Sequence, residues 1–171
     1  MWYVIWATTG REELTRIAIE KNIDSSLYSR LSIPHIVKLE RKAGVDREVV
    51  RRILPSYIFV ETVFIQEFAN KLKHMPGFSV VLHNEGYWPL SDDEQKTLLS
   101  LIKDGDIIDI SSGFMENGRV KVISGPLTGA EGFIKKINVR KRLARVEIDM
   151  FGTKIGVDLG LKILEQDGNK Y

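Results

Sequence analysis

The sequence contains no cysteine among its 171 residues, which excludes disulfide bonds and thiolate metal sites. It has no apolar run of about eighteen residues, so we expect no transmembrane helix. The opening MWYVIWATTGREE lacks a basic region ahead of a long apolar core, and we expect no signal peptide. A cysteine-free chain without these segments fits a protein of the reducing cytoplasm that has no membrane contact.

Signals of catalysis are also scarce. The three histidines, His35, His74 and His83, are scattered and lack the spacing of metal ligands. The stretch SGPLTG at residues 124–129 has neither the lysine nor the spacing of a P-loop. The acidic run at residues 92–94 is better explained by helix capping than by acid–base catalysis. We therefore expect no enzymatic activity, no cofactor and no bound metal.

The net charge of +2 is unevenly distributed along the chain. Residues 1–116 hold 14 basic and 17 acidic side chains, a net charge of −3. Residues 117–171 hold 11 basic and 6 acidic side chains, a net charge of +5. A polyanionic partner would therefore meet the C-terminal part of the chain.

The first part of the chain mixes strand and helix patterns. Residues 1–8 carry apolar side chains on both faces, with Trp2, Val4 and Trp6 on one of them, so this strand should be internal to its sheet. Residues 28–52 predict a hairpin or an extended arm with a polar turn. The further elements expected here are a strand at 54–64, a helix at 66–74 and a strand at 78–82.

Two capping boxes predict the starts of helices, because a hydroxyl and a carboxylate three residues apart satisfy free amides of the first turn. Thr9 with Glu12 would begin a helix that ends near Asn22, and Ser91 with Glu94 would begin another. The apolar residues expected on the buried stripes are Leu14, Ile17 and Ala18 in the first helix, and Leu98, Leu101 and Ile102 in the second.

These patterns divide the chain into three parts. Residues 1–105 are assigned to an α+β domain with a mixed or antiparallel sheet flanked by helices. Residues 106–117 are rich in Asp, Ser and Gly and are taken as a linker, although the isoleucines at 107, 108 and 110 could instead form an edge strand. Residues 118–171 are predicted to be a small all-β domain.

Short strands and glycine-containing turns fill this last domain and predict a closed or nearly closed small barrel. The expected strands span 119–123, 132–138 and 144–151, with two shorter ones around Ile155 and Ile163. A turn is expected at 139–142. Clean alternation in the third strand assigns its inward-facing positions to Ala144, Val146, Ile148 and Met150.

Several sequence pieces, taken in order, carry a family signal. They are Trp2-Tyr3-Val4, LPSYIFVE at 54–61, MPGF at 75–78, RVKVISGPLTGAEGFI at 119–134 and FG at 151–152. With these pieces at this spacing, the chain resembles the NusG family of transcription elongation factors over essentially its full length. The resemblance implies an N-terminal polymerase-binding NGN domain and a C-terminal KOW domain with an SH3-like barrel.

Two features resemble specialised members of that family. Many family members have glycine where this chain has Ser56. The segment GPLTGAEGFIKKINVRKRLARVE at 125–147 looks like the LoaP group of processive antiterminators, chiefly through its Arg-Lys-Arg turn. In that group the KOW domain is thought to bind a structured RNA leader.

The densest basic cluster lies around this turn. Its members are Lys135, Lys136, Arg140, Lys141, Arg142 and Arg145. If the hairpin centres on Arg140, Lys135 faces Arg145 directly, and such like-charge pairs are destabilising unless a polyanion neutralises them. Folded RNA suits the cluster because a bulge or loop opens the deep A-form groove, where arginine can pair with guanine. The alternative is a solvated turn that serves solubility.

The resemblance implies further contacts, each with burial as its alternative. The residues matching positions that pack against the clamp helices of the largest polymerase subunit are Trp6, Leu54, Tyr57 and Phe59. Those matching positions that touch non-template DNA in some relatives are His74 and Met75. In the housekeeping factors, the positions of Met150 and Phe151 help dock a ribosomal protein or a termination factor.

We expect a monomeric processive elongation or antitermination factor that binds RNA polymerase and a structured hairpin in the nascent RNA leader. Within the family, the alternative is a general elongation factor whose KOW domain binds only proteins. From another class, the chain could be a ribosome-associated or RNA-packing KOW protein.

Overall fold

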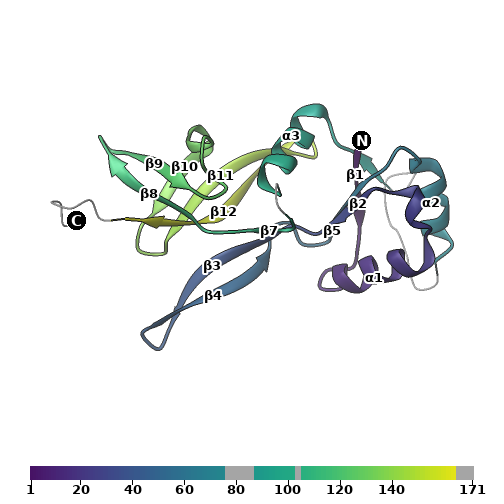
Figure 1. Ribbon diagram of the computed structural model, residues 1–171, viewed down its shortest axis with the longest axis horizontal. Helices are drawn as coiled ribbons and strands as arrows, with labels where there is room; N and C mark the ends of the chain where they lie inside the picture. The colour runs from purple at the N-terminus through teal and green to yellow at the C-terminus, as the bar shows by residue number, and fades with distance from the viewer. Residues whose placement is uncertain (76–86, 103–104, 165–171) are drawn as a thin grey trace. The chain divides into compact units, whose positions relative to one another are not determined.

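The computed structural model describes residues 1–75, 87–102 and 105–164 (Figure 1). The chain separates into two compact units. The first comprises Met1–Ile33 and Leu54–Gln95, and the second comprises Pro34–Ile53 and Lys96–Tyr171. The domain boundaries expected at residues 105 and 118 stay a prediction. None of the helices in the described part of the chain has the length and hydrophobicity to cross a lipid bilayer.

The first unit is built on a four-stranded sheet of order β2-β5-β1-β6. Its strands are β1 (Trp2–Trp6), β2 (Arg30–Ser32), β5 (Tyr57–Glu61) and β6 (Trp88–Pro89). Its helical elements are α1 (Glu12–Asn22), the 3-10 turn η1 (Ser25–Leu27) and α2 (Ile65–Lys73), while α3 (Asp92–Leu101) continues into the second unit. Strand β1 lies between β5 and β6, which confirms the prediction of an internal strand.

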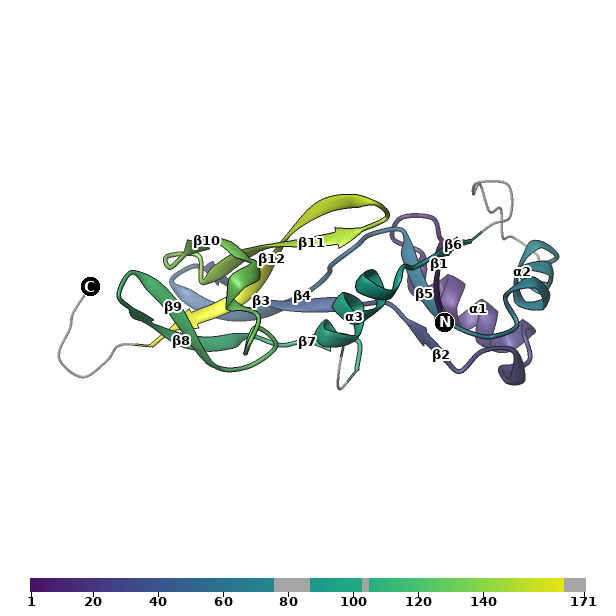
Figure 2. The same cartoon turned by 90° about the horizontal axis from the view of Figure 1, so that it is seen from above.

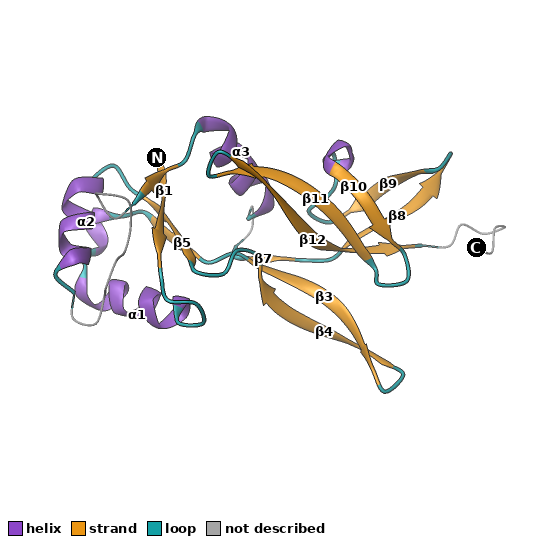
Figure 3. Ribbon diagram, turned by 180° about the vertical axis from the view of Figure 1, so that it is seen from behind, coloured by secondary structure: helices purple, strands orange, loops and turns teal. Residues whose placement is uncertain are grey.

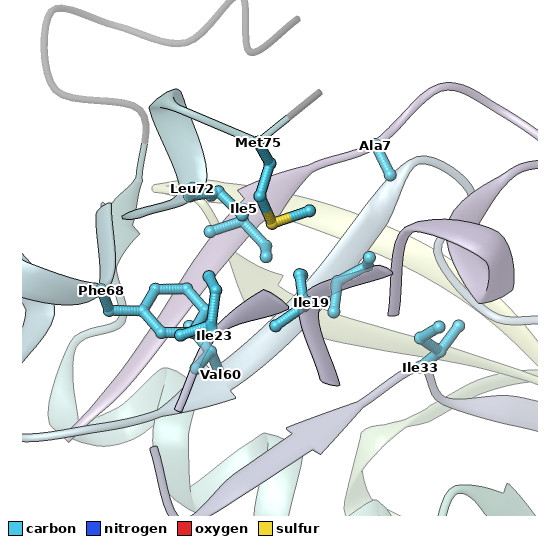
Figure 4. Packing of buried hydrophobic residues seen from close by; sticks show 10 residues of the cluster. Ile5, Ala7, Ile19, Ile23, Ile33, Val60, Phe68, Leu72 and Met75 are labelled. Carbon is cyan, nitrogen blue, oxygen red and sulfur yellow. The ribbon is translucent and has the colours of Figure 1, made fainter. Parts of the chain in front are cut away.

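The core of this unit lies between the sheet and helices α1 and α2 (Figure 4). Ile5 and Val60 contribute from the sheet, Ile19 from α1, and Phe68 and Leu72 from α2. Each of these side chains is at most 1% exposed. Full burial of one such side chain stabilises the fold by about 1.5–3 kcal/mol.

The start of α1 differs from the predicted capping box. Glu12 Oε1 accepts a hydrogen bond from the Ser56 amide at 2.8 Å, and the Thr9 hydroxyl bonds the Ser56 hydroxyl. The helix N-cap, Arg11, makes no side-chain capping bond. Ser56 is buried in a left-handed conformation with φ of 73°, and its amide needs an acceptor that the local turn does not supply. The two capping-box residues therefore hydrogen-bond Ser56 instead of capping the helix.

The buried face of α1 was predicted wrongly at two of its three positions, while Ala18 is partly buried against the core as predicted. Leu14 and Ile17 are 63% and 55% exposed, whereas Glu12 and Ile19 are fully buried. Burying Glu12 against Ser56 sets the rotation of the helix, and Ile19 then falls on the same face two turns later. The expected end of the helix at Asn22 is confirmed.

The second capping box is confirmed. The Ser91 amide donates to Glu94 Oε2 at 2.8 Å, and the Glu94 amide donates to Ser91 Oγ at 3.3 Å. Leu98 and Ile102 are buried as predicted. The helix predicted at 66–74 is observed as α2, while the strand predicted at 78–82 lies outside the described residues.

The region 28–52, predicted as a hairpin or an extended arm, divides between the units: Arg30–Ser32 forms β2 of the first sheet, and the hairpin lies in the second unit. Strands β3 (His35–Lys42) and β4 (Val45–Arg52) join through Ala43 and Gly44, whose φ angles of 51° and 81° are typical of a tight type I′ turn. Strand β7 (Ile107–Ile108) pairs parallel to β3, so two of the linker isoleucines form the edge strand named as the alternative.

The remaining strands of this unit form a five-stranded sheet of order β10-β11-β12-β8-β9 (Figure 3). They are β8 (Ser111–Glu116), β9 (Arg119–Ser124), β10 (Ile134–Asn138), β11 (Leu143–Met150) and β12 (Thr153–Ile163), with the 3-10 turn η2 (Glu131–Phe133) before β10. All four inward-facing positions predicted in β11 are buried. The two short strands expected around Ile155 and Ile163 are one long strand, because β12 pairs first with β11 and then with β8.

A glycine lets the β3–β4 hairpin approach this sheet. A Cβ atom on Gly160 of β12 would lie 2.8 Å from the Val37 carbonyl oxygen of β3, closer than any real Cβ contact. Only glycine therefore allows the two strands to pass at this distance. Figures 1 and 2 show the hairpin extending along the C-terminal strands, and this position brings its tip region to the turn between β10 and β11.

Candidate nucleic-acid interface

The turn between β10 and β11 presents the densest group of cations in the chain. The flanking pair is Asn138 and Leu143, and the predicted turn at 139–142 is confirmed. Asn138 Oδ1 accepts from the Lys141 amide at 2.9 Å. The Arg142 amide donates to the Val139 carbonyl at 3.1 Å. These bonds fix the backbone of the tip, so the exposed side chains of Arg140 and Lys141 are held on a defined support.

Arg142 occupies a conformation that favours glycine. Its φ is 55°, in the left-handed region that costs a residue with a Cβ atom about 1 kcal/mol or more. Its guanidinium Nη1 donates to Asp46 Oδ2 at 2.6 Å, so the turn is tied to strand β4. The two side chains remain 35% and 37% exposed. The chain keeps arginine where glycine would fit the backbone better.

The predicted pairing of Lys135 with Arg145 is wrong by one residue. A β-bulge between Ile134 and Lys136 shifts the register, and Lys136 lies opposite Arg145. The like-charge pair therefore exists, but with a different lysine. Arg145 also donates to Asp158 Oδ1 at 3.0 Å, and Lys135 lies 3.8 Å from a Glu147 carboxylate oxygen.

These ion pairs divide the predicted cluster in two. Lys135 and Arg145, on the strands, each have a carboxylate partner. Arg140 and Lys141 at the tip, and Lys136 beside them, are exposed and form no ion pair with any described residue. The tip is therefore the part of the cluster with the most positive charge available to a ligand.

A groove separates the tip from the β3–β4 hairpin. It has a volume of about 540 Å³. Its basic lining includes Lys38 and Arg41 from β3 as well as Arg140, Lys141 and Arg142 from the turn. The sequence analysis missed Lys38 and Arg41, because nothing local indicates that residues so distant in the chain meet. The available signal was the excess of basic residues within 35–52.

Of the four aromatic and apolar residues predicted to form a surface in the first unit, Trp6 is exposed and Tyr57 is half-buried. Trp6 and Tyr57 are register partners on β1 and β5, with ring centroids 5.6 Å apart. Trp6 is 46% exposed. Leu54 and Phe59 are 7% and 0% exposed, so they lie in the interior.

Helix α2 ends at the two residues predicted to contact non-template DNA. His74 is exposed, and its Nδ1 lies 2.7 Å from the Asn70 carbonyl oxygen. Met75 is 7% exposed and belongs to the core of the first unit. Only the histidine is therefore available at the surface.

The turn between β11 and β12 lies at the two residues predicted to dock a ribosomal protein or a termination factor. Met150 is 1% exposed, as its inward alternation predicted. Phe151 and Gly152 have φ angles of 57° and 67°, typical of a type I′ turn. Phe151 is half-buried and so presents part of its ring to solvent. In the part of the chain that the structure describes, no group of His, Asp and Glu is arranged to hold a metal ion.

Comparisons with known proteins agree on one family. A family model described as "Transcription termination factor nusG" matches residues 1–99. The transcription termination/antitermination protein NusG of Halalkalibacterium halodurans is 26% identical over 173 residues, covering 96% of this chain and 97% of the relative. The corresponding protein of Bacillus subtilis is 28% identical over 167 residues, covering 92% and 93%.

A solved structure leads to the same conclusion. "Domain interaction in Thermotoga maritima NusG" has a TM-score of 0.55 and 26% identity, and covers 93% of this chain and 92% of that one. NusG-family factors are transcription factors rather than enzymes, which confirms the expectation of no catalytic activity. With a family model that matches more than half of its residues, the chain belongs to the NusG family of transcription termination and antitermination factors.

Proposed function

We propose that the chain is a specialised NusG-family factor for processive elongation and antitermination, and that its C-terminal domain binds structured nascent RNA. The observation that carries the proposal is the β10–β11 turn, where Arg140 and Lys141 are exposed without an ion-pair partner among the described residues. Arg142 beside them keeps a left-handed backbone that glycine would adopt at lower cost.

The C-terminal domain of this proposal is a KOW domain with an SH3-like barrel. The order of its five strands leaves β9 and β10 as the two edges. Glu131, next to β10, accepts a hydrogen bond from the Val122 amide of β9 at 3.2 Å. This bond between the regions of the two edges supports a nearly closed barrel.

The RNA in this proposal is a hairpin with a bulge or an internal loop. A regular A-form duplex has a major groove too deep and narrow for side chains, whereas a bulge opens it. A rigid tip with adjacent arginines can enter such an opening, and an arginine can bond a guanine edge in a bidentate manner. The resemblance of residues 125–147 to the LoaP antiterminators supports the same ligand class.

The first unit is proposed to bind RNA polymerase through its aromatic pair. Trp6 and Tyr57 would receive the clamp helices of the largest subunit, as a helix is received in an aromatic groove. Leu54 and Phe59 would support this surface from the interior. His74 is the residue proposed to reach non-template DNA. When the first unit binds polymerase and the C-terminal domain binds the nascent RNA, the RNA element raises the local concentration of the factor at the transcripts that carry it.

The test is a selection of RNA ligands from a pool of hairpins with randomised bulges, using the full-length protein, followed by footprinting. We expect hairpins to be enriched, and we expect the Arg140→Ala/Lys141→Ala variant to lose them. A matched control is Lys154→Ala/Lys162→Ala, which removes two exposed lysines of β12. Absence of enrichment, or equal binding by the first variant, would refute the proposal.

A second candidate is a general elongation factor whose C-terminal domain binds only proteins. The observation that favours it is Phe151, a bulky residue kept at positive φ with part of its ring exposed. Capture of a ribosomal or termination protein that depends on Phe151, with no RNA bound, would support this candidate. Failure to sediment with core RNA polymerase would instead favour a ribosome-associated protein.

A further inference from the structure

The groove beside the basic turn has a second wall that the proposed function does not use. We propose that the β3–β4 hairpin forms half of the RNA site, so that the sugar–phosphate backbone lies in the groove between the hairpin and the β10–β11 turn. This inference rests on the proposed function and adds to it a second, distant segment of the chain. The proposal is supported by the lining of the groove, by its cations without ion-pair partners among the described residues and by the ion pair that joins its walls.

The groove is lined by charged side chains from both segments. Its cations are Lys38, Arg41, Arg140, Lys141 and Arg142, and its carboxylates are Glu40 and Asp46. Its volume of about 540 Å³ is far larger than a phosphate group needs. Cations on opposite walls can therefore contact successive phosphates of one strand.

The carboxylates of the groove already have partners. Glu40 lies 3.2 Å from the guanidinium of Arg51 on the neighbouring strand. Asp46 lies 2.6 Å from the guanidinium of Arg142. Lys38 and Arg41 on the hairpin wall, and Arg140 and Lys141 on the turn wall, form no ion pair with any described residue. A polyanion in the groove can pair with these four cations, two of which line each wall.

The composition of the lining favours a nucleic-acid backbone over a protein partner. Leu39 and Leu143 are its only apolar side chains, both are partly buried, and no aromatic residue lines the groove in the part of the chain described here. Protein interfaces are usually anchored by buried aromatic and apolar residues, which this groove does not offer. Phosphates, by contrast, are bound mainly by lysine and arginine, independently of base sequence.

The Asp46–Arg142 ion pair gives the groove a free and a bound form. Both side chains are more than a third exposed, and ion pairs of this kind are weak in water. A phosphate can therefore replace Asp46 as the partner of Arg142. In the free protein Asp46 holds the hairpin and the turn together, and in the complex it competes with the RNA for the arginine.

The experiment compares two double variants of the full-length protein, with a bulged RNA hairpin recovered by the selection as the probe. Lys38→Ala/Arg41→Ala removes the two cations of the second wall. Lys42→Ala/Arg47→Ala removes two cations of the same hairpin that do not line the groove. Circular dichroism and thermal melting verify that both variants fold like the wild type.

We expect the first variant to bind roughly tenfold more weakly and to lower the slope of log affinity against log salt by about 1–2, since each lost phosphate contact removes about 0.7–0.9. The control should change affinity by less than about twofold, because its charges lie outside the contact. Asp46→Asn should bind severalfold more tightly, because Arg142 is then free of its competitor.

The outcomes separate the two claims. If Arg140→Ala/Lys141→Ala abolishes binding while Lys38→Ala/Arg41→Ala behaves like its control, the turn is the site and the second wall is refuted. If neither variant differs from the wild type in RNA affinity, both the second wall and the proposed RNA-binding function are refuted. If Asp46→Asn weakens binding, Asp46 does not compete with RNA for Arg142, and that role is refuted.

Discussion

Strand β11 ends in two turns of opposite chemistry. At one end, the β10–β11 turn holds Arg142 at φ of 55°, and at the other, the β11–β12 turn holds Phe151 at φ of 57°. Both residues occupy the left-handed region, where glycine or asparagine would be more stable. One turn carries consecutive cations, and the other carries an aromatic ring beside the buried Met150.

The two turns of this one sheet therefore offer different chemistry to a partner. Both turns keep a residue with a Cβ atom where glycine would be less strained, which is the reason to test each side chain for contact. Under the proposed function the first turn would bind a polyanion, and under the second candidate the other turn would dock a protein.

The largest effect is expected at the cationic tip. Arg140→Ala/Lys141→Ala should weaken RNA binding at least about tenfold and flatten its salt dependence, because phosphate and guanine contacts are lost together. A mobility-shift titration at several salt concentrations measures both. Phe151→Asn is the matched change at the opposite turn and should leave RNA binding intact. If Phe151→Asn weakens binding as much, the two turns do not have separate roles.

Arg142→Gly separates strain from function at the same turn. Glycine relieves the left-handed backbone while the side chain and its ion pair are lost, so the unfolding free energy should change by no more than about 1 kcal/mol. RNA binding should nevertheless fall severalfold. Urea unfolding measures the change in unfolding free energy, and the mobility-shift assay measures the change in RNA affinity. Unchanged RNA binding would mean that the strained arginine serves only the fold.

Ser56→Gly supplies a control for this reasoning, because Ser56 is strained but buried. Its φ is 73°, and its hydroxyl bonds Thr9. Glycine removes the strain and also removes that bond, so the net change in unfolding free energy should stay within about 1 kcal/mol. RNA binding should equal that of the wild type. Weakened RNA binding here would show that relieving strain away from the turn also lowers affinity, so the Arg142→Gly result could not be assigned to a lost contact.

The smallest effect is expected for the ion pair between the hairpin and the turn. Because both side chains are more than a third exposed, a double-mutant cycle of Asp46→Ala and Arg142→Ala should give a coupling of about 0.2–1 kcal/mol. Urea unfolding of the two single variants and the double variant measures it. The coupling should decline in high salt. A coupling of zero at low salt would show that this ion pair does not hold the two walls of the groove together.

Predictions from sequence succeeded where neighbouring residues decide the outcome. The alternation of β11, the Ser91–Glu94 capping box and the β3–β4 hairpin were all predicted from residues close in the chain. Family membership, likewise, followed from short motifs and their order. These features depend on local geometry that a pattern records directly.

The predictions that failed depend on distant partners. Glu12 leaves its helix cap for Ser56, 44 residues away, because a buried amide there needs an acceptor. A β-bulge moves Lys136 into the position predicted for Lys135. The second wall of the groove comes from a hairpin nearly a hundred residues from the turn, with Asp46 and Arg142 separated by 96 positions. Composition showed that the C-terminal part is basic, but it could not show that the β3–β4 hairpin lies beside the basic turn.

The most direct test of the central claim is RNA binding by the full-length protein and its Arg140→Ala/Lys141→Ala variant, across a range of salt concentrations. The account predicts that the wild type binds bulged hairpins in a salt-dependent manner and that the variant loses both the affinity and much of the slope. Binding by the variant that equals that of the wild type at every salt concentration would contradict it.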